Sequence, residues 1–461
     1  MVLIKVFYFA TYKQKIGIDR EEIEIEKPTK VKEFKNILVA KYPNVILDAN
    51  SLLVSINRKY ALDEDLILDG DQVAIFPPIS GGDLSSQLNL GIYCRNCGSP
   101  YPDQGVPYRC LKCGGVYQIK KTPQFNENSN RELEGIWSSL DLSSLGIVDN
   151  LITLGEGNTP LLLDNFWATK KKDVYYKCEY QNPTGSFKDR GSAALITLLQ
   201  NKGIKEIYED SSGNAGASIA AYAARAGMKA HIYIPAKASC VKREQIKRYG
   251  AEIVSIEGKR SEVSEKLIQD YSQNKSGEKA YASHAYSPFN LLGYSTIAYE
   301  LIKQLGKVPE TVIAPVGQGG GLLGVYHGFK SLYDRKLISF LPVLIGVQAS
   351  ACAPLWAAFE YGPSGLQWIQ EGETVTEGIR IKNPIRGDEV LEAIRFTNGR
   401  LYIVEEDEIL DAGNSLAQRG FWIEPTSAVV EAAMKKYIAE LQPPIVAILT
   451  GSGYKTLEVY G

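Results

Sequence analysis

The sequence lacks long apolar runs, is poor in histidine and has no excess of either charge. No stretch of 18 apolar residues occurs, and Lys5 interrupts the apolar start of the chain, which argues against a membrane span and a secretory signal. Lys plus Arg number 51 and Asp plus Glu number 53, a balance that disfavours nucleic acid and anionic membranes as partners. The presence of only three histidines argues against a histidine-rich catalytic metal centre. We therefore expect a cytoplasmic globular protein that acts on a small molecule.

A disulfide framework is also not expected, because the seven cysteines are unevenly placed. Three are scattered, and four form two Cys-x2-Cys pairs separated by twelve residues: Cys94, Cys97, Cys110 and Cys113. Four thiolates at this spacing can surround one ion in a tetrahedron and leave no open coordination position. Gly98 and Gly114 follow the two pairs and favour tight turns there. Residues 83–125 are thus predicted to hold a linker and a zinc ribbon with a structural ion, the alternative being reduced cysteines in a loop.

The first 82 residues have the pattern of a small β-grasp domain. LIKVFYFATYKQ and EEIEIE alternate apolar and polar positions as paired strands do, and LLVSINRKYA and QVAIFPP supply two later strands. Between them, a helix is expected after a cap at Thr29. Its apolar face is predicted to contain Val31, Phe34, Ile37 and Leu38. The resulting order of two strands, a helix and two strands is typical of a β-grasp fold.

This segment ends in SINRKYALDEDLILDGDQVAIFPPISGG, which resembles the closing half of the small sulfur-carrier subunit of molybdopterin synthase. The resemblance covers residues 1–82 and implies a ubiquitin-like domain. In that family a terminal Gly-Gly is adenylated and converted to a thiocarboxylate, so it implies an adenylating enzyme and a protease as partners at Gly81-Gly82. Here Gly82 is followed by Asp83 in the same chain. The alternative is an inherited docking module whose two glycines serve only as a linker.

The remaining sequence, residues 126–461, alternates strand-like and helix-like segments, which predicts an α/β domain with a mostly parallel sheet. In CEYQNPTGSFKDRG, Lys188 is expected at the start of a helix. The backbone N–H groups of that helix and the charges of Lys177 and Arg190 are expected to lower the pKa of the Lys188 amine. A partly neutral lysine can bind an aldehyde covalently.

Three more turns follow strand-like segments and are suited to bind a ligand. Ser212, Gly213 and Asn214 precede a helix, where free backbone N–H groups attract an anion. GQGGGLLG also lies between a strand and a helix, and Thr450 stands at the tip of the last strand, where open α/β sheets place ligands. Neither a P-loop lysine nor the G-x-G-x-x-G spacing with its distant acidic residue is present, so a nucleotide is disfavoured.

The motifs NPTGSFKDRG, SSGNAG, GQGGGLLG and TGSGYK, in this order, resemble those of fold type II pyridoxal-phosphate enzymes. LGEGNTPLL, the cysteine-rich segment and IEPTSAVVEAA are similar to threonine synthase and its archaeal-type paralogues. The resemblance covers residues 126–461. It implies an α/β, tryptophan synthase β-like fold with two α/β subdomains, bound pyridoxal 5'-phosphate and a homodimer.

The same resemblance implies a role for each motif residue. Lys188 would bind the cofactor aldehyde, Asn214 its ring hydroxyl and Thr450 its pyridine nitrogen, while Phe187 lies under the ring. The cofactor phosphate would be held by Gly317, Gln318, Gly319, Gly320 and Gly321. The substrate carboxylate would be held by Ser211, Ser212 and Ala215. The three histidines, His231, His284 and His327, receive no role.

The implied activity is elimination or replacement on an O-phosphorylated or related hydroxy-amino acid, such as conversion of O-phosphohomoserine to threonine. Two features depart from threonine synthase. GQGGGL is closer to the phosphate loop of dehydratases and serine-type enzymes. Residues 287–290, SPFN, stand where relatives have an arginine-bearing NPYR-like stretch, so a substrate phosphate would need Arg380, Lys382 or Arg386.

Two alternative functions therefore remain. One is a β-replacing, cysteine synthase-type enzyme, or a serine/threonine dehydratase-like lyase, supplied with sulfur by its own Gly-Gly carrier domain. The other is a precursor of a sulfur carrier for molybdopterin or thiolation, released by cleavage after Gly82.

Overall fold

The structure, a computed structural model, separates the chain into two compact units, Met1–Asp83 and Leu84–Gly461. The predicted processing site at Gly81-Gly82 and the linker after it lie outside the described residues. The boundary after residue 125 stays a prediction. The described residues are 2–8, 12–13, 16–43, 45, 49, 52–57, 59–76, 91–102, 105–120, 125, 133–142, 150–237, 240–258, 260–273, 277–369 and 371–460.

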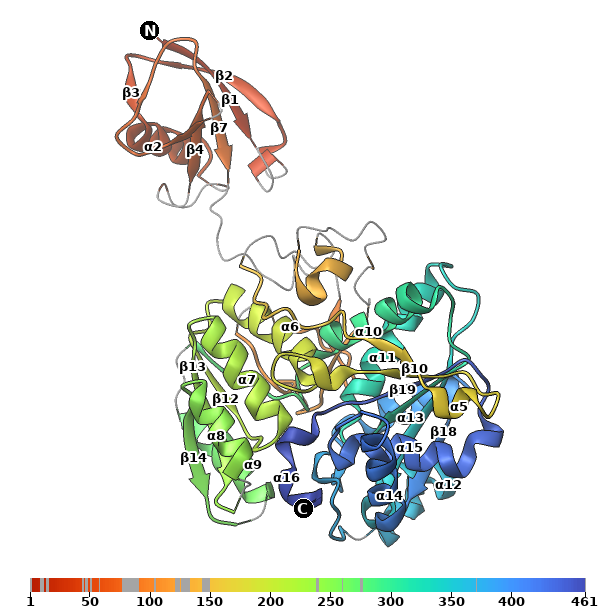
Figure 1. Ribbon diagram of the computed structural model, residues 1–461. Helices are drawn as coiled ribbons and strands as arrows, with labels where there is room; N and C mark the ends of the chain where they lie inside the picture. The colour runs from red at the N-terminus through yellow and green to blue at the C-terminus, as the bar shows by residue number, and fades with distance from the viewer. Residues whose placement is uncertain are drawn as a thin grey trace. The chain divides into compact units, whose positions relative to one another are not determined.

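The first unit is a β-grasp, as predicted, with one helix lying against a five-stranded sheet (Figure 1). The sheet has the order β2-β1-β7-β4-β5, in which β1 and β7 are parallel and the other pairs are antiparallel. The elements are β1 (Val2–Tyr8), β2 (Arg20–Ile25), β3 (Thr29–Lys30), α2 (Val31–Lys41), β4 (Leu53–Ile56), β5 (Lys59–Ala61), β6 (Leu66–Ile67) and β7 (Gln72–Phe76).

Two details of the predicted helix α2 are wrong. Thr29 does not cap it, because Thr29 pairs with Ile67 in the short β3–β6 ladder and its hydroxyl donates to the Lys27 carbonyl. Ile37 is 39% exposed, whereas Val31, Phe34 and Leu38 are fully buried. Positions i, i+3 and i+7 share one side of a helix, and position i+6 turns away from it.

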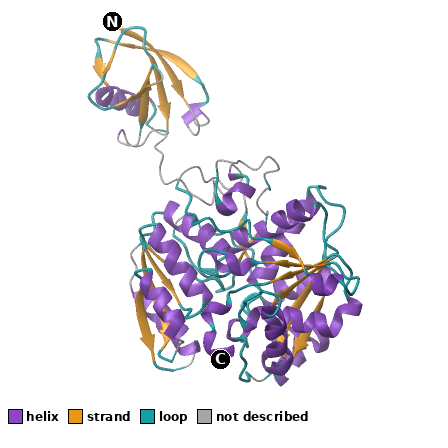
Figure 2. Cartoon of the chain, viewed as in Figure 1, coloured by secondary structure: helices purple, strands orange, loops and turns teal. Residues whose placement is uncertain are grey.

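The two larger sheets of the second unit have helices around them, which confirms the predicted α/β class (Figure 2). The smaller sheet, in the order β14-β13-β12-β15, is parallel throughout. Its strands are β12 (Glu206–Glu209), β13 (Lys229–Pro235), β14 (Glu252–Ile256) and β15 (Lys279–Tyr281). The helices connected to it are α6 (Lys188–Asn201), α7 (Asn214–Arg225), α8 (Cys240–Arg248) and α9 (Arg260–Gln273).

The larger sheet has the order β10-β11-β19-β16-β17-β18, and only its edge strand β10 runs antiparallel. Its strands are β10 (Leu161–Leu163), β11 (Val174–Lys177), β16 (Thr311–Pro315), β17 (Val343–Ala349), β18 (Arg400–Val404) and β19 (Ile445–Ile448). The longer helices are α10 (Asn290–Leu305), α11 (Gly320–Asp334), α12 (Pro354–Tyr361), α13 (Gly387–Phe396), α14 (Glu406–Ala417) and α15 (Pro425–Tyr437). The short elements include β8 (Ile92–Cys94), β9 (Tyr117–Ile119), α5 (Asn165–Ala168) and α16 (Leu457–Tyr460).

The connections place the three turns that were predicted to bind a ligand at carboxyl ends of parallel strands. The segment 210–213 follows β12, the glycine loop follows β16, and Thr450 comes just after β19. Helix α10 packs against both α6 and α11, so the helices that follow Lys188 and the glycine loop share one neighbour. Among the described residues, no helix combines the length and the apolar character needed to cross a membrane.

Candidate functional site

Lys188 is the first residue of α6, as predicted, and the loop before it is tightly held. The Asp189 carboxylate accepts hydrogen bonds from the Thr184 backbone N–H and hydroxyl, both at 2.6 Å. The Phe187 N–H donates to the Thr450 carbonyl at 3.0 Å, and the Ser452 N–H donates to the Gly185 carbonyl at 3.0 Å. The lysine is therefore fixed directly against the turn that follows β19.

Burial lowers the pKa of the Lys188 amine from 10.5 to about 8. The charges that act on it come from Glu209, which raises this pKa, from Arg260, which lowers it, and from Glu424, which raises it. The amine lies 4.8 Å from the centre of the Phe187 ring. The predicted lowering is therefore found, but desolvation is its main cause, not Lys177 or Arg190.

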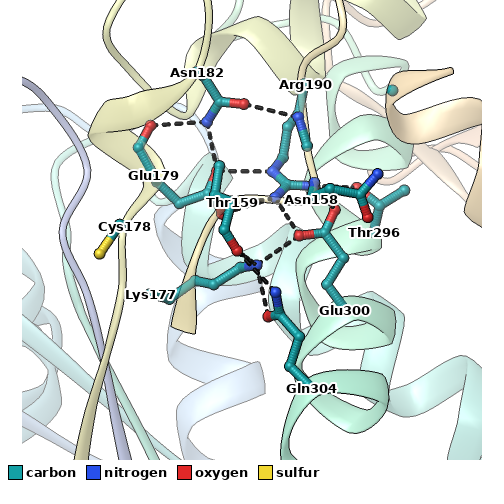
Figure 3. Close-up of polar contacts among 12 residues, drawn as sticks. Asn158, Thr159, Lys177, Cys178, Glu179, Asn182, Arg190, Thr296, Glu300 and Gln304 are labelled. Atoms are coloured by element: carbon teal, nitrogen blue, oxygen red, sulfur yellow. Dashed lines mark hydrogen bonds and ion pairs between the residues drawn. The ribbon is translucent and has the colours of Figure 1, made fainter. Parts of the chain in front are cut away.

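Lys177 and Arg190 instead belong to a buried ion network (Figure 3). Arg190 donates to both oxygens of Glu179 at 2.7 Å and to both oxygens of Glu300 at 2.6 and 2.7 Å. Lys177 donates to Glu300 at 2.6 Å and to the Thr159 carbonyl at 2.7 Å. Because the network pairs two cations with two carboxylates, it has little net charge that could act on Lys188, which is two residues from Arg190 in the sequence. The network anchors the start of α6 to β11 and α10.

The motif LGEGNTPLL contributes to the same network. The Asn158 N–H donates to Glu300 at 2.8 Å, and the Thr159 hydroxyl donates to Glu179 at 2.6 Å. The Gly157 N–H donates to the Asn182 side-chain oxygen at 2.9 Å. This motif therefore supports the loop that carries Lys188.

The glycine loop, residues 317–321, ends at the first turn of α11, and Gly319 caps the helix with a left-handed φ of 83°. A Cβ on Gly321 would lie 2.9 Å from the Phe187 ring, and one on Gly317 would lie 2.8 Å from the Ile379 Cα. The loop thus runs directly against the Lys188 turn and against residues 378–381. The Gln318 side-chain oxygen accepts the Ile385 N–H at 2.8 Å. It ties the loop to the segment before α13.

The segment after β12 brings a second helix start to the site. Asn214 is the first residue of α7, Ser211 and Ala215 are each 8% exposed, and Ser212 is partly buried. The Asn214 side chain lies between the Lys455 amine and the Glu424 carboxylate. Thr450 is also buried, and its hydroxyl lies 2.9 Å from that of Ser427.

The prediction missed four polar residues around this site. Glu424 and Lys455 contact Asn214, and both lie inside motifs that were recognised, IEPTSAVVEAA and TGSGYK. Glu209 is buried at the end of β12, and burial raises its pKa well above the ordinary value. His284 is buried with Nδ1 2.6 Å from the Tyr294 hydroxyl and Nε2 3.1 Å from that of Ser192.

Burial and the Lys188 charge lower the pKa of His284 well below its ordinary value, so its imidazole is neutral at pH 7. His231 pairs with Glu206 at the first residue of β12, at the opposite end of that strand from the 210–213 turn. Burial lowers the pKa of His327, within α11, to about 4. The absence of assigned roles for His231 and His327 is thus consistent with their positions.

These residues fit pyridoxal 5'-phosphate. The buried Lys188 amine, with its lowered pKa, suits the cofactor's aldehyde. The backbone amides at the starts of α7 and α11 suit its anionic groups, and the buried Thr450 hydroxyl suits its ring nitrogen. Within the described part of the chain, Ser186 Oγ and Glu209 Oε2 are buried oxygens with no hydrogen-bond partner. Unsatisfied buried oxygens beside Lys188 are expected where a polar ligand is to be received.

Among the three basic residues considered for a substrate phosphate, Arg386 is already engaged. It is 3% exposed and donates to Glu389 at 2.8 Å and to the carbonyls of Tyr117 and Tyr286 at 2.9 and 2.7 Å. Lys382 is exposed. Arg380 is partly buried, and it follows Ile379, which touches the glycine loop.

The four clustered cysteines come together as predicted. Their sulfur atoms all lie within 4.8 Å of one another, with Cys94 and Cys113 at 3.5 Å and Cys97 and Cys110 at 3.7 Å. A tetrahedral zinc ion with bonds of about 2.3 Å requires sulfur separations of about 3.8 Å. The predicted tight turns are present after both cysteine pairs, since the Gly98 and Gly114 N–H groups donate to the carbonyls of Cys94 and Cys110. The cluster can hold zinc.

This cysteine cluster is also packed against the segment before α10. The ring of Tyr101 meets that of Phe289 with centres 5.7 Å apart, and Tyr108 meets Tyr286 at 5.2 Å. Arg386 joins the carbonyl of Tyr117 in β9 to that of Tyr286. Loss of the metal should therefore loosen residues 281–289 as well as the ribbon.

Replacement of the buried Cys110 by serine is expected to remove the bound zinc and lower the melting temperature by several degrees. Metal analysis of purified protein and a thermal melt measure the two effects. Cys352→Ser is the control, because Cys352 is buried outside the cluster and its loss should leave the zinc content at one ion per chain. Full zinc content in the Cys110→Ser protein would contradict the assignment.

Comparisons with known proteins agree with this arrangement. Residues 152–451 match the family of pyridoxal-phosphate dependent enzymes, and residues 6–82 match the ThiS family. A threonine synthase of Methanocaldococcus jannaschii is 33% identical over 377 residues, covering 78% of this chain and 92% of that protein. One from Methanosarcina acetivorans is 33% identical over 354 residues, covering 75% and 86%.

Among solved structures, a threonine deaminase from T.th. has a TM-score of 0.54 and 27% identity, over 64% of this chain and 92% of that one. The predicted fold and cofactor class are thereby confirmed. The chain belongs to the pyridoxal-phosphate-dependent enzyme family, in which its relatives include threonine synthases, and it carries a ThiS-family β-grasp domain in addition.

Proposed function

We propose that the chain converts O-phosphohomoserine to threonine with pyridoxal 5'-phosphate. The observation that carries the proposal is the position of Lys188, whose amine has a pKa lowered by burial and whose neighbour Phe187 contacts the turns after β16 and β19. The 33% identity to the threonine synthase of Methanocaldococcus jannaschii over 92% of its length supports the choice of substrate. The bound cofactor would supply an electron sink that makes the substrate Cα proton acidic.

In this proposal each predicted site residue has a separate role in binding or proton transfer. Lys188 would hold the cofactor aldehyde covalently when its amine is neutral, and its free amine would be placed to take the substrate Cα proton. Asn214 would donate to the ring hydroxyl from its Nδ2, and the backbone N–H groups of residues 317–321 would hold the phosphate. Ser211, Ser212 and Ala215 hold the substrate carboxylate through hydroxyl and N–H groups.

Thr450 faces the pyridine nitrogen in this proposal. A neutral hydroxyl does not force that nitrogen to be protonated as a carboxylate would, which favours elimination and replacement. Ser427 supports this assignment, because its hydroxyl lies 2.9 Å from the Thr450 hydroxyl and fixes its orientation. The aromatic ring of Phe187 contacts both Lys188 and Gly321. In this proposal it covers one face of the cofactor ring.

A substrate phosphate needs a cation that the protein does not fully enclose. Arg386 is enclosed by protein acceptors, so we assign this contact to Arg380, which neighbours the glycine loop through Ile379. The Nε of Arg380 lies 3.5 Å from a Glu371 oxygen.

The decisive experiment incubates purified, cofactor-loaded protein with O-phosphohomoserine as the only substrate. We expect equal amounts of threonine and inorganic phosphate to be released. O-acetylserine, O-phosphoserine, serine and threonine are supplied in parallel. Turnover of a serine derivative without turnover of O-phosphohomoserine would refute the proposal.

A second candidate function is favoured by one observation, the match of the ThiS family, which ends at Gly82. On this reading the chain is a β-replacing synthase whose sulfur comes from its own carrier domain. Its partners would be an adenylating enzyme and a protease that cuts after Gly82. It predicts consumption of a serine derivative together with a thiocarboxylate form of residues 1–82, and absence of any adenylation of that fragment would refute it.

Two further properties belong to the proposal. A homodimer follows from the resemblance to fold type II enzymes, and sedimentation of the full chain tests it. A cytoplasmic location is favoured by four thiols gathered at one metal site, which need a reducing compartment.

The pKa of Lys188 leads to a prediction for cofactor capture. With a pKa of about 8, roughly a tenth of the amine is neutral at pH 7 and half at pH 8. The rate at which cofactor-free protein binds pyridoxal 5'-phosphate covalently should therefore rise roughly fivefold from pH 7 to pH 8 and level off above pH 9. Stopped-flow absorbance measures it, with Nα-acetyllysine as the control for titration of the free cofactor. A rate that still rises about eightfold between pH 9 and pH 10 would indicate an ordinary lysine.

A further inference from the structure

Lys455 and Glu424 lie on opposite sides of the Asn214 side chain. The Lys455 amine donates to Asn214 Oδ1 at 3.0 Å. Asn214 Nδ2 donates to the two Glu424 oxygens at 2.9 and 3.2 Å. Lys455 and Glu424 are each only 6% exposed. A cation and an anion thus enclose the amide in a largely dry setting.

This arrangement allows only one orientation of the amide. An ammonium group is only a donor and a carboxylate is only an acceptor, whereas the two ends of an asparagine amide are an acceptor and a donor. Rotating the amide by 180° would place Nδ2 against the ammonium group and Oδ1 against the carboxylate. Both contacts would then be repulsive, so Lys455 and Glu424 together fix Nδ2 on the side away from Lys455.

Contacts of the surrounding backbone hold Lys455 in position. Its side chain passes Gly185 in the loop before Lys188, where a Cβ would lie 3.1 Å from Lys455 Cε. The Ser452 N–H donates to the Gly185 carbonyl, and the Lys455 N–H returns to the Ser452 carbonyl at 3.3 Å. Glu424 is held in turn by its N–H, which donates to the Gly451 carbonyl at 3.0 Å. One turn, residues 450–455, therefore orients Thr450, Lys455 and Glu424 together.

We propose that Lys455 is a positioning residue for the cofactor, which it serves by holding Asn214 so that Nδ2 is the end presented to the ring hydroxyl. The inference rests on the proposed role of Asn214. Nδ2 carries two hydrogens, and with one shared between the two Glu424 oxygens the other is available for the cofactor oxygen. Without Lys455 the amide can rotate, and its acceptor end would then face that oxygen for part of the time.

A double-mutant cycle tests whether Lys455 acts through Asn214. The dissociation constant for pyridoxal 5'-phosphate is measured by fluorescence titration of the full chain for Lys455→Met, Asn214→Ala and the double variant. We expect Lys455→Met to raise the constant about tenfold, which corresponds to one hydrogen bond to a charged group. The double variant should bind no more weakly than Asn214→Ala alone, because Lys455 has nothing left to orient.

Three further measurements separate positioning from stability. Lys455→Gln should recover most of the affinity, since its amide can still donate to Asn214 Oδ1. Melting temperatures of the cofactor-free variants should stay close to that of the unmodified chain. Lys435→Met, an exposed lysine on α15, is the matched control and should bind the cofactor normally.

The contrary results are distinct. Equal losses for Lys455→Met in the presence and absence of Asn214 would show independent effects and overturn the inference. Full affinity in folded Lys455→Met protein, with Asn214→Ala still impaired, would overturn it as well. Full affinity in Asn214→Ala would instead refute the proposed role of Asn214 itself, and the inference would fail with it.

Discussion

Lys188→Ala is expected to abolish turnover of O-phosphohomoserine, with a loss of at least about 10³-fold in kcat, and to leave the fold intact. The amine is assigned both covalent attachment of the cofactor and transfer of the Cα proton, and a methyl group can do neither. The residue as a whole is partly exposed, so removal of its side chain leaves a small void at the surface of the site. Stability should therefore change much less than activity.

Borohydride reduction followed by peptide mass analysis identifies the attachment point directly. In the unmodified chain, the reduced cofactor should be found on the peptide that contains Lys188. Lys202→Ala is the matched control, since Lys202 lies at the other end of α6 and should leave both attachment and turnover unchanged. Cofactor attached to any other lysine, or turnover by Lys188→Ala near the normal rate, would refute the catalytic assignment.

The site shows why its chemistry could be predicted from sequence. Lys188, Asn214, residues 317–321 and Thr450 occur in turns that follow β-strands or begin helices. In α/β proteins ligands bind at the carboxyl ends of parallel strands, and here the strands β12, β16 and β19 come from both larger sheets. Local patterns therefore identified residues that the fold brings together. The residues that hold them in place were not found, because such partners are far apart in the chain. Lys455 is 241 positions from Asn214, and Glu300 is 110 positions from Arg190.

The same limit explains the errors in the prediction. The charges of Lys177 and Arg190 were expected to lower the pKa of Lys188. In the fold these charges are neutralised by Glu179 and Glu300, and these two partners could not be assigned from sequence. Arg386 was considered for the substrate phosphate, yet the fold surrounds it with Glu389 and three backbone carbonyls. At Thr29, a two-residue ladder with β6 competes with helix capping and prevails.

Glu300→Ala is expected to cost about 3–5 kcal/mol of the free energy of unfolding of the second unit. The Glu300 carboxylate is 3% exposed and accepts four hydrogen bonds at 2.6 to 2.8 Å, from Lys177, from Arg190 twice and from the Asn158 N–H. Burial raises its pKa, but Arg190 and Lys177 prevail and hold it at about 2. Removal of the Glu300 carboxylate leaves two buried cations with Glu179 as the one remaining carboxylate of the network, so one positive charge is no longer neutralised.

All five tryptophans lie beyond residue 84, so urea unfolding followed by tryptophan fluorescence reports on the second unit within the full chain. Glu392→Ala is the control, because this glutamate pairs with Arg95 at the surface and should cost less than about 1 kcal/mol. Since the pKa of Glu300 is depressed, its contribution is present above the ordinary value of 4.5 and is lost as the pH falls toward 2. The difference between Glu300→Ala and the unmodified chain should therefore shrink in acid. A cost no larger than that of Glu392→Ala at pH 7 would mean that the network does not hold the start of α6, and the support proposed for Lys188 would have to come from elsewhere.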